Sequence, residues 1–167
     1  MFKTFNSLLA TLFGLGKIKF MPGTFGSLAT VIFLFYLFHT LNISPNIFLI
    51  GWISIFIYSF YAVSTHIRDS KNKDPGEIII DEFLGQSIPI YLYEISHKTT
   101  KESNEAIVYY VLFFILFRYF DIMKPFPVSF FDKNFKNSFG VIMDDICAGL
   151  YVVLTLVCFM IVKSHIL

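Results

Sequence analysis

Two pairs of adjacent acidic residues stand out because each lies where a long apolar segment begins. Asp81 and Glu82 occur just inside one such segment, and Asp144 and Asp145 precede another. An unpaired charge in an apolar segment is costly, so these acids need partners. Mg²⁺ is a suitable partner because it binds a few carboxylate oxygens and keeps water positions that a phosphate can occupy. If the two segments are neighbouring helices, the four acids form a carboxylate cage for Mg²⁺.

The residues before the first acidic pair have two explanations. Asp74, Glu77 and Asp81 are spaced three and four apart, so on a helix their carboxylates lie near one stripe and repel one another unless a cation is bound. The same stretch also fits a helix start, with Asp74 as the N-cap and Glu77 completing a capping box. For Asp144 and Asp145 the alternative is a helix first turn, where the macrodipole favours negative charge.

A third group combines both charge signs near the end of an apolar segment. Arg118, Asp121 and Lys124 follow one another at intervals of three residues. An ion pair between Arg118 and Asp121 with Lys124 as an interfacial anchor is one explanation. In a phosphate site, Lys124 and Arg118 would instead hold phosphate oxygens and stabilise their charge in the transition state.

A glycine-containing stretch precedes the first long apolar segment. It includes Gly23, Thr24, Gly26 and Ser27. Glycines at a helix N-terminus expose backbone N–H groups that can hold an anion, and Thr24 and Ser27 add hydroxyl groups. This predicts a substrate-phosphate site at Gly23, Thr24 and Ser27, although glycines also serve turns and close helix packing.

The composition indicates that a membrane holds these groups. The chain of 167 residues is 56% apolar and 15% charged, against about 45–50% and about 25% for typical soluble domains. Such a chain is neither an ordinary soluble domain nor disordered. Its net charge of +1 gives no indication of nucleic-acid binding. We therefore expect a single-domain, all-α integral membrane protein.

Apolar segments long enough to cross a bilayer recur along the chain. They predict a compact bundle of about five transmembrane helices with an N-terminal interfacial helix over residues 1–14. The five expected spans are residues 25–41, 47–65, 78–95, 106–123 and 146–162.

Charge then orients the bundle. With five spans, most of the 13 basic and 12 acidic residues fall on one side of the membrane, and the positive-inside rule makes that side cytoplasmic. The site would therefore face the cytoplasm. The alternative function is a divalent-cation transporter or channel, because intramembrane carboxylates also mark ion pathways. The clustering of the acids at one face argues against it.

Four blocks together resemble one known family. They are PGTFGS at 22–27, KDPGEIIIDEFLG at 73–85, FRYFDIMKPFP at 117–127 and FGVIMDDICAG at 139–149. In order and spacing they resemble the bacterial phosphatidylglycerophosphatase A family. The combination is highly specific, whereas any single block is not.

The resemblance implies a Mg²⁺-dependent phosphatase of the cytoplasmic (inner) membrane. Its expected substrate is a phospholipid, phosphatidylglycerophosphate, which it would hydrolyse to phosphatidylglycerol in phospholipid biosynthesis. Asp81, Glu82, Asp144 and Asp145 are then the expected metal ligands. The expected catalytic residues are Asp74, Asp121, Lys124 and Arg118, and the sequence leaves open whether Asp74 or Asp121 is the general base.

Overall fold

This computed structural model describes residues 2–69, 76–97 and 103–166, and all regular secondary structure in that part of the chain is helical. This confirms the predicted all-α class. The helices are α1 (Phe2–Ala10), a 3-10 turn (Leu15–Lys17), α2 (Pro22–Phe35) continued by a π-helical turn (Tyr36–Thr40), α3 (Pro45–Asp69), α4 (Ile80–Ser96), α5 (Ser103–Met123), α6 (Val128–Asn134) and α7 (Ser138–Ile166).

Four helices in the described part of the chain are long and apolar enough to cross a membrane. They cover residues 22–40, 45–68, 104–123 and 138–164. They correspond to four of the five predicted spans, and they make the protein a multi-pass membrane protein.

The remaining predicted span, α4, is a different kind of helix. It has 17 residues, of which 11 are buried, and at 1.5 Å per residue it is about 25 Å long, shorter than a typical hydrocarbon core of about 30 Å. The other helices cover it, so its apolar side chains pack against protein. The five predicted segments are therefore four long apolar helices and one shorter, buried helix, α4, which they enclose.

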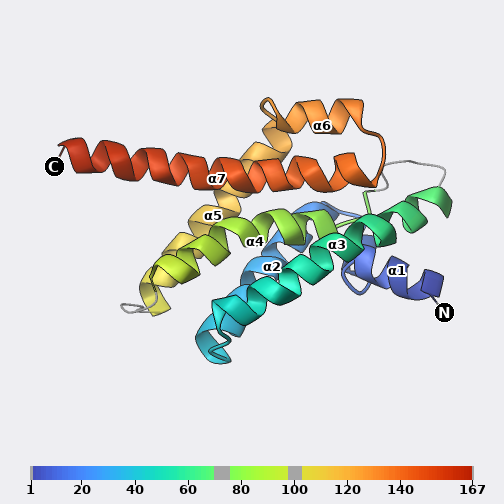
Figure 1. Ribbon diagram of the computed structural model, residues 1–167, viewed down its shortest axis with the longest axis horizontal. Coiled ribbons are helices and arrows are strands. Elements are labelled where there is room, and N and C mark those ends of the chain that lie inside the picture. Colours follow the sequence, from blue (N-terminus) through green and yellow to red (C-terminus); the bar gives the residue numbers. More distant parts are fainter. Residues whose placement is uncertain (1, 70–75, 98–102, 167) are drawn as a thin grey trace.

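Helices α4 and α7 lie side by side with their N-terminal ends on the same side of the molecule (Figure 1). Glycines allow this close approach. A β-carbon on Gly149 of α7 would stand 2.3 Å from the carbonyl oxygen of Gly85 in α4, closer than van der Waals contact permits. The contact confirms that the third and fifth apolar segments are neighbours, which the predicted carboxylate cage required.

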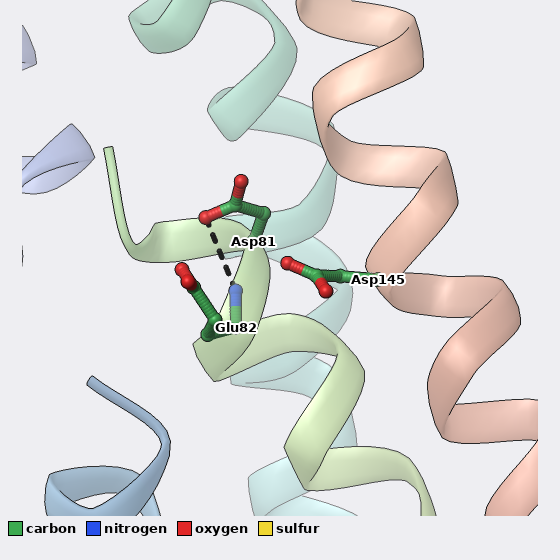
Figure 2. Close-up of side chains that lie close together, drawn as sticks. All are labelled: Asp81, Glu82 and Asp145. Atoms are coloured by element: carbon green, nitrogen blue, oxygen red, sulfur yellow. Dashed lines mark hydrogen bonds between the residues drawn. The ribbon is translucent and has the colours of Figure 1, made fainter. Parts of the chain in front are cut away.

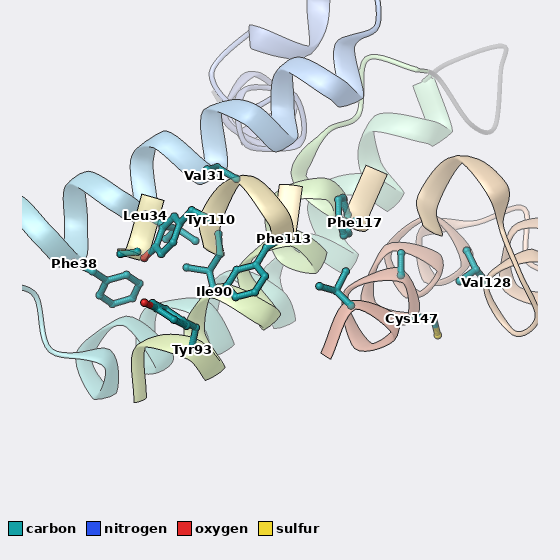
Figure 3. Packing of buried hydrophobic residues seen from close by; sticks show 13 residues of the cluster. Val31, Leu34, Phe38, Ile90, Tyr93, Tyr110, Phe113, Phe117, Val128 and Cys147 are labelled. Carbon is teal, nitrogen blue, oxygen red and sulfur yellow. The ribbon is translucent and has the colours of Figure 1, made fainter. Parts of the chain in front are cut away.

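The largest apolar core lies between α2, α4, α5 and α7 (Figure 3). Leu34, Ile90, Phe113 and Phe117 are almost completely buried there. Because lipid is as apolar as these side chains, close packing and not the hydrophobic effect holds such a core together in a membrane. The core therefore fixes how α4 and α5 are placed relative to α7, and with them the acidic residues at the helix ends.

The N-terminal helix α1 packs against α3 through polar contacts. Asn6 is buried, accepts a hydrogen bond from the Tyr58 hydroxyl at 2.7 Å and donates one to Thr65 at 2.9 Å. The apolar Phe5 is instead 52% exposed. The predicted helix over residues 1–14 is also shorter in the structure. It ends at Ala10, because Leu12, Phe13 and Gly14 have positive φ values that a right-handed helix does not allow.

Two helix boundaries also differ from expectation, and both matter for the acids. Helix α4 begins at Ile80, so Glu77 does not share a helical stripe with Asp81. Helix α7 begins at Ser138, where the Asn137 side chain accepts hydrogen bonds from the Phe139 and Gly140 amides at 3.1 and 3.2 Å. Asp144 and Asp145 therefore lie in the second turn of α7, and the first-turn macrodipole explanation is wrong.

Candidate active site

A cavity of about 370 Å³ lies where α2, α4 and α7 begin and α5 ends. It brings together residues from all four sequence blocks. The predicted site residues that line it are Gly23, Thr24, Asp81, Glu82, Arg118, Asp121, Lys124, Asp144 and Asp145.

Three carboxylates converge in this cavity (Figure 2). Asp81, Glu82 and Asp145 each place a carboxylate oxygen within 4.8 Å of those of the other two. Glu82 Oε2 and Asp145 Oδ1 are buried and have no hydrogen-bond partner in the described structure. Buried carboxylate oxygens without partners are costly, and a hard divalent cation removes that cost. The three residues therefore fit a Mg²⁺-type site.

The fourth predicted metal ligand, Asp144, has a different partner. Its Oδ2 accepts a hydrogen bond from Lys124 Nζ at 2.8 Å, and Asp132 Oδ1 accepts another from the same ammonium group at 2.7 Å. Burial by itself would lower the pKa of Lys124, but these two carboxylates raise it above its ordinary value. Lys124 is therefore charged, and it links α6 to α7.

Asp132 is affected by the same contact. Partial burial by itself would raise the pKa of this carboxyl group, but the hydrogen bond and charge of Lys124 lower it below its ordinary value. The pair is thus a charged carboxylate and a charged ammonium group at the rim of the cavity.

Arg118 lies near Glu82 of the acid cluster and close to Asp121. Its Nη1 atom lies 2.5 Å from Asp121 Oδ2 and 3.8 Å from Glu82 Oε1. This confirms the ion pair predicted from the i, i+3 spacing. The Nε atom of Arg118 is buried and has no hydrogen-bond partner in the described structure, so the guanidinium group retains a donor that an anion in the cavity could satisfy.

The start of α2 contributes one hydroxyl group and a close backbone approach. The Thr24 hydroxyl is buried beside the cavity without a partner in the described residues. A β-carbon on Gly23 would stand 2.1 Å from Glu82 Oε1, so a larger residue here would displace the Glu82 carboxylate. Ser27, the third predicted phosphate residue, does not line the cavity. It is fully buried and its hydroxyl donates to the Gly23 carbonyl at 3.0 Å.

One described acid of the 73–85 block, Glu77, is not part of this cluster. Asp74, a predicted catalytic residue, lies outside the described residues. Glu77 Oε1 lies 2.8 Å from His66 Nε2, so it links the segment before α4 to the end of α3. Sequence reasoning missed Asp132 and Lys136, which also line the cavity. Their signal was weak, because charged residues in a polar loop are common.

One buried acid lies at the other end of α4. Glu94 Oε1 accepts a hydrogen bond from the Tyr110 hydroxyl at 2.9 Å and lies 3.2 Å from His39 Nε2. Between Glu82 and Glu94 the helix carries no charged residue over about 18 Å. The charged residues of α4 therefore form two separated clusters. They do not line a continuous path for an ion along the helix.

Comparison with known proteins identifies the family. The sequence profile of the family described as phosphatidylglycerophosphatase A matches residues 8–160. The chain belongs to the phosphatidylglycerophosphatase A family. Membership makes the protein a phosphatase.

Individual relatives agree with this assignment. The chain is 38% identical over 147 residues to phosphatidylglycerophosphatase A of Haemophilus influenzae, covering 88% of this chain and 83% of that protein. It is 31% identical over 143 residues to the Escherichia coli protein of the same name, covering 85% and 76% of the two chains. A Bacteroides thetaiotaomicron protein named putative phosphatidylinositol-3-phosphatase is 30% identical over 145 residues, or 86% of each chain. No solved structure matches the chain significantly.

The four sequence blocks of the phosphatidylglycerophosphatase A family meet in space at the cavity. The 22–27 block provides Thr24, the 73–85 block provides Asp81 and Glu82, and the last two blocks provide Lys124 and Asp145. The blocks are far apart along the chain, so their convergence on one polar cavity is a tertiary finding.

Proposed function

We propose that the protein hydrolyses the terminal phosphate of phosphatidylglycerophosphate, giving phosphatidylglycerol and inorganic phosphate in phospholipid biosynthesis. The observation that carries this proposal is the acid cluster of Asp81, Glu82 and Asp145, which lies beside Arg118 and Lys124 in one cavity at the helix ends. Carboxylates that hold a metal ion together with cations that hold a phosphate are the groups needed for phosphoryl transfer to water.

Asp81, Glu82 and Asp145 would hold Mg²⁺. The fit rests on their convergence within 4.8 Å and on the two buried carboxylate oxygens without partners. When bound, Mg²⁺ supplies charge neutralisation at the phosphate and a lowered pKa for a water molecule. Asp144 is left out of this ligand set because its carboxylate holds Lys124.

Arg118 and Thr24 would bind the phosphate oxygens. The unsatisfied Nε of Arg118 and the unsatisfied hydroxyl of Thr24 are both donors beside the cavity, and phosphate oxygens are strong acceptors. Asp121 orients Arg118 through the 2.5 Å contact. Lys124 contributes positive charge at the rim, where Asp132 and Asp144 hold its side chain in place.

The reaction breaks the bond between phosphorus and the glycerol oxygen, and a water oxygen replaces it. The departing glycerol oxygen takes up a proton and the attacking water loses one. Asp121 lines the cavity and is the described acid outside the metal cluster that we propose as the proton acceptor. In a loose transition state most of the rate enhancement comes from positioning and charge stabilisation.

The location follows from the same arrangement. The cavity lies at the ends of membrane-spanning helices, which is the depth of lipid head groups. The distribution of basic residues favours the cytoplasmic side. We therefore propose the inner membrane of a bacterium with the active site facing the cytoplasm.

The test is phosphate release from phosphatidylglycerophosphate by detergent-purified protein, with Mg²⁺ and with excess EDTA. We expect release with Mg²⁺ and none with EDTA. Phosphatidylinositol 3-phosphate serves as a parallel substrate because one relative is named for that activity. Faster release from the inositol lipid would replace the proposed substrate, and release that persists in EDTA would remove the metal from the proposal.

A further inference from the structure

The rim of the catalytic cavity is apolar and exposed on one side. Met21, directly before α2, and Ile122, in the last turn of α5, both line the cavity. Their side chains are 48% and 63% exposed. Ile122 lies one turn after Arg118 and on the same face of α5, and Arg118 lies against the start of α2 at Gly23. Met21 and Ile122 therefore flank a seam between α2 and α5.

This seam faces the lipid. Helix α5 is a candidate membrane span up to Met123, and α2 is one from Pro22. An exposed apolar side chain at the end of a membrane span contacts acyl chains or the head-group boundary, not bulk water. The cavity is thus bordered by the bilayer at the position of Met21 and Ile122.

Another lining residue of the cavity is charged and not apolar. Lys136, between α6 and α7, lines the cavity and is exposed. It lies outside the candidate spans and forms no ion pair within the described residues. An exposed, charged rim is suited to contact with water. The cavity is therefore bordered by exposed apolar side chains at Met21 and Ile122 and by an exposed charged side chain at Lys136.

A phospholipid substrate likewise has a charged part, the head group, and an apolar part, the acyl chains. The cavity of about 370 Å³ is near the lower end of the range that encloses a whole drug-sized ligand, about 300–1,000 Å³. It can hold a phosphorylated head group, while two acyl chains have to stay outside it. The head group can lie in the cavity while the acyl chains stay in the bilayer only if the glycerol backbone passes through an apolar opening at membrane depth.

We propose that the seam between Met21 and Ile122 is a lateral portal through which the lipid head group enters the cavity from the bilayer. The glycerol backbone and acyl chains of a lipid anchored in the bilayer must pass between these two side chains, whereas a short-chain analogue dissolved in water can enter the cavity from the Lys136 side. The portal makes Met21 and Ile122 specificity-determining residues that favour membrane lipids over soluble phosphate esters. This inference rests on the proposed function.

The test narrows the portal with Ile122→Trp. Met123→Trp is the matched control, because Met123 is the next residue on α5 and is also 63% exposed, but it does not line the cavity. Each protein is assayed with long-chain phosphatidylglycerophosphate in nanodiscs and with a dihexanoyl analogue that dissolves in water and can enter from the Lys136 side. Activity on the soluble analogue also shows that the variant is folded. Met21→Trp is a second narrowing variant on the other side of the seam.

We expect Ile122→Trp and Met21→Trp to lower kcat/KM for the long-chain lipid by about tenfold or more. Hydrolysis of the soluble analogue should stay within about twofold of wild type, as should both activities of Met123→Trp. Equal losses on the two substrates, no loss on either, or a matching loss in Met123→Trp would overturn the portal. Failure of the wild-type protein to hydrolyse either lipid would overturn the proposed function, and the portal with it.

Discussion

Gly85 of α4 is in direct backbone contact with Asp145 of α7. A β-carbon on Gly85 would stand 2.3 Å from the Asp145 carbonyl oxygen and 2.8 Å from Phe117 Cε2. Asp81 lies one turn before Gly85 on α4, so this contact determines how far the Asp81 carboxylate is from that of Asp145. The acid cluster therefore depends on the absence of a side chain at Gly85 as well as on the acids themselves.

Replacement of Gly85 by alanine should damage both stability and activity. The added methyl group must separate α4 from α7, and overpacking of this kind typically costs about 1–3 kcal/mol. We expect a lower unfolding temperature in detergent and a lower kcat. Gly51→Ala is the control, because nothing lies within 4 Å of the added β-carbon in α3 and alanine favours a helix by up to about 1 kcal/mol. An unaffected Gly85→Ala protein would show that the contact does not position the acids.

Replacement of Asp145 by asparagine tests the metal ligands separately from turnover. In EDTA the variant should unfold at the same temperature as wild type or higher, because repulsion with Asp81 and Glu82 is relieved. With Mg²⁺ at 100 times its dissociation constant, only the wild-type protein should gain about 2.7 kcal/mol of stability. Thermal unfolding with and without Mg²⁺ measures this. Glu105→Gln, an exposed acid on α5, should behave as wild type, and a Mg²⁺ response retained by Asp145→Asn would exclude Asp145 as a ligand.

Replacement of Lys124 by methionine removes a charge that two acids share. Asp132 and Asp144 then lose their common partner, and phosphate loses a nearby cation. We expect kcat to fall by roughly 10²-fold, with partial recovery in Lys124→Arg. Steady-state kinetics on the lipid substrate would measure both variants. Lys133→Met, at an exposed position on α6, is the control, and a similar loss there would point to general surface charge and not to Lys124.

The Glu94 cluster should affect stability without affecting catalysis. Tyr110→Phe removes the hydrogen bond to Glu94, which should cost about 1 kcal/mol. Because the cluster lies about 18 Å along α4 from Glu82, kcat/KM should stay near the wild-type value. Unfolding temperature and phosphate release on the same preparation would check this. Tyr109→Phe, at a position 40% exposed, is the control, and a large loss of activity in Tyr110→Phe would show coupling between the two ends of α4.

The linear pattern was sufficient to predict the class of protein and most of the polar residues that meet in the cavity. Long apolar segments predict membrane helices because a bilayer requires their length, and the acids at segment ends were conspicuous because charge is costly there. Asp81, Glu82 and Asp145 were all recognised in this way. The pattern did not show that α4 is buried, because a helix buried by other helices and a helix facing lipid have similar apolar compositions.

Helix starts were also poorly predicted. The sequence placed the last helix at residue 146, whereas Asn137 caps it and it begins at Ser138. A cap depends on a few local hydrogen bonds that an apolar segment does not reveal. Asp132 lies on the short helix α6, which the sequence did not predict. It was therefore not recognised as a partner of Lys124.

The sequence by itself determined that the protein is a helical membrane protein of the phosphatidylglycerophosphatase A family with acids at helix ends, because residue types and their spacing are local information. Only the tertiary structure decided which acids meet. Asp145 joins Asp81 and Glu82, while its neighbour Asp144 binds Lys124. Adjacent residues on a helix point about 100° apart, so the division between the two aspartates depends on how α7 is rotated against α4. The close contacts at Gly85 and Gly149 fix that rotation.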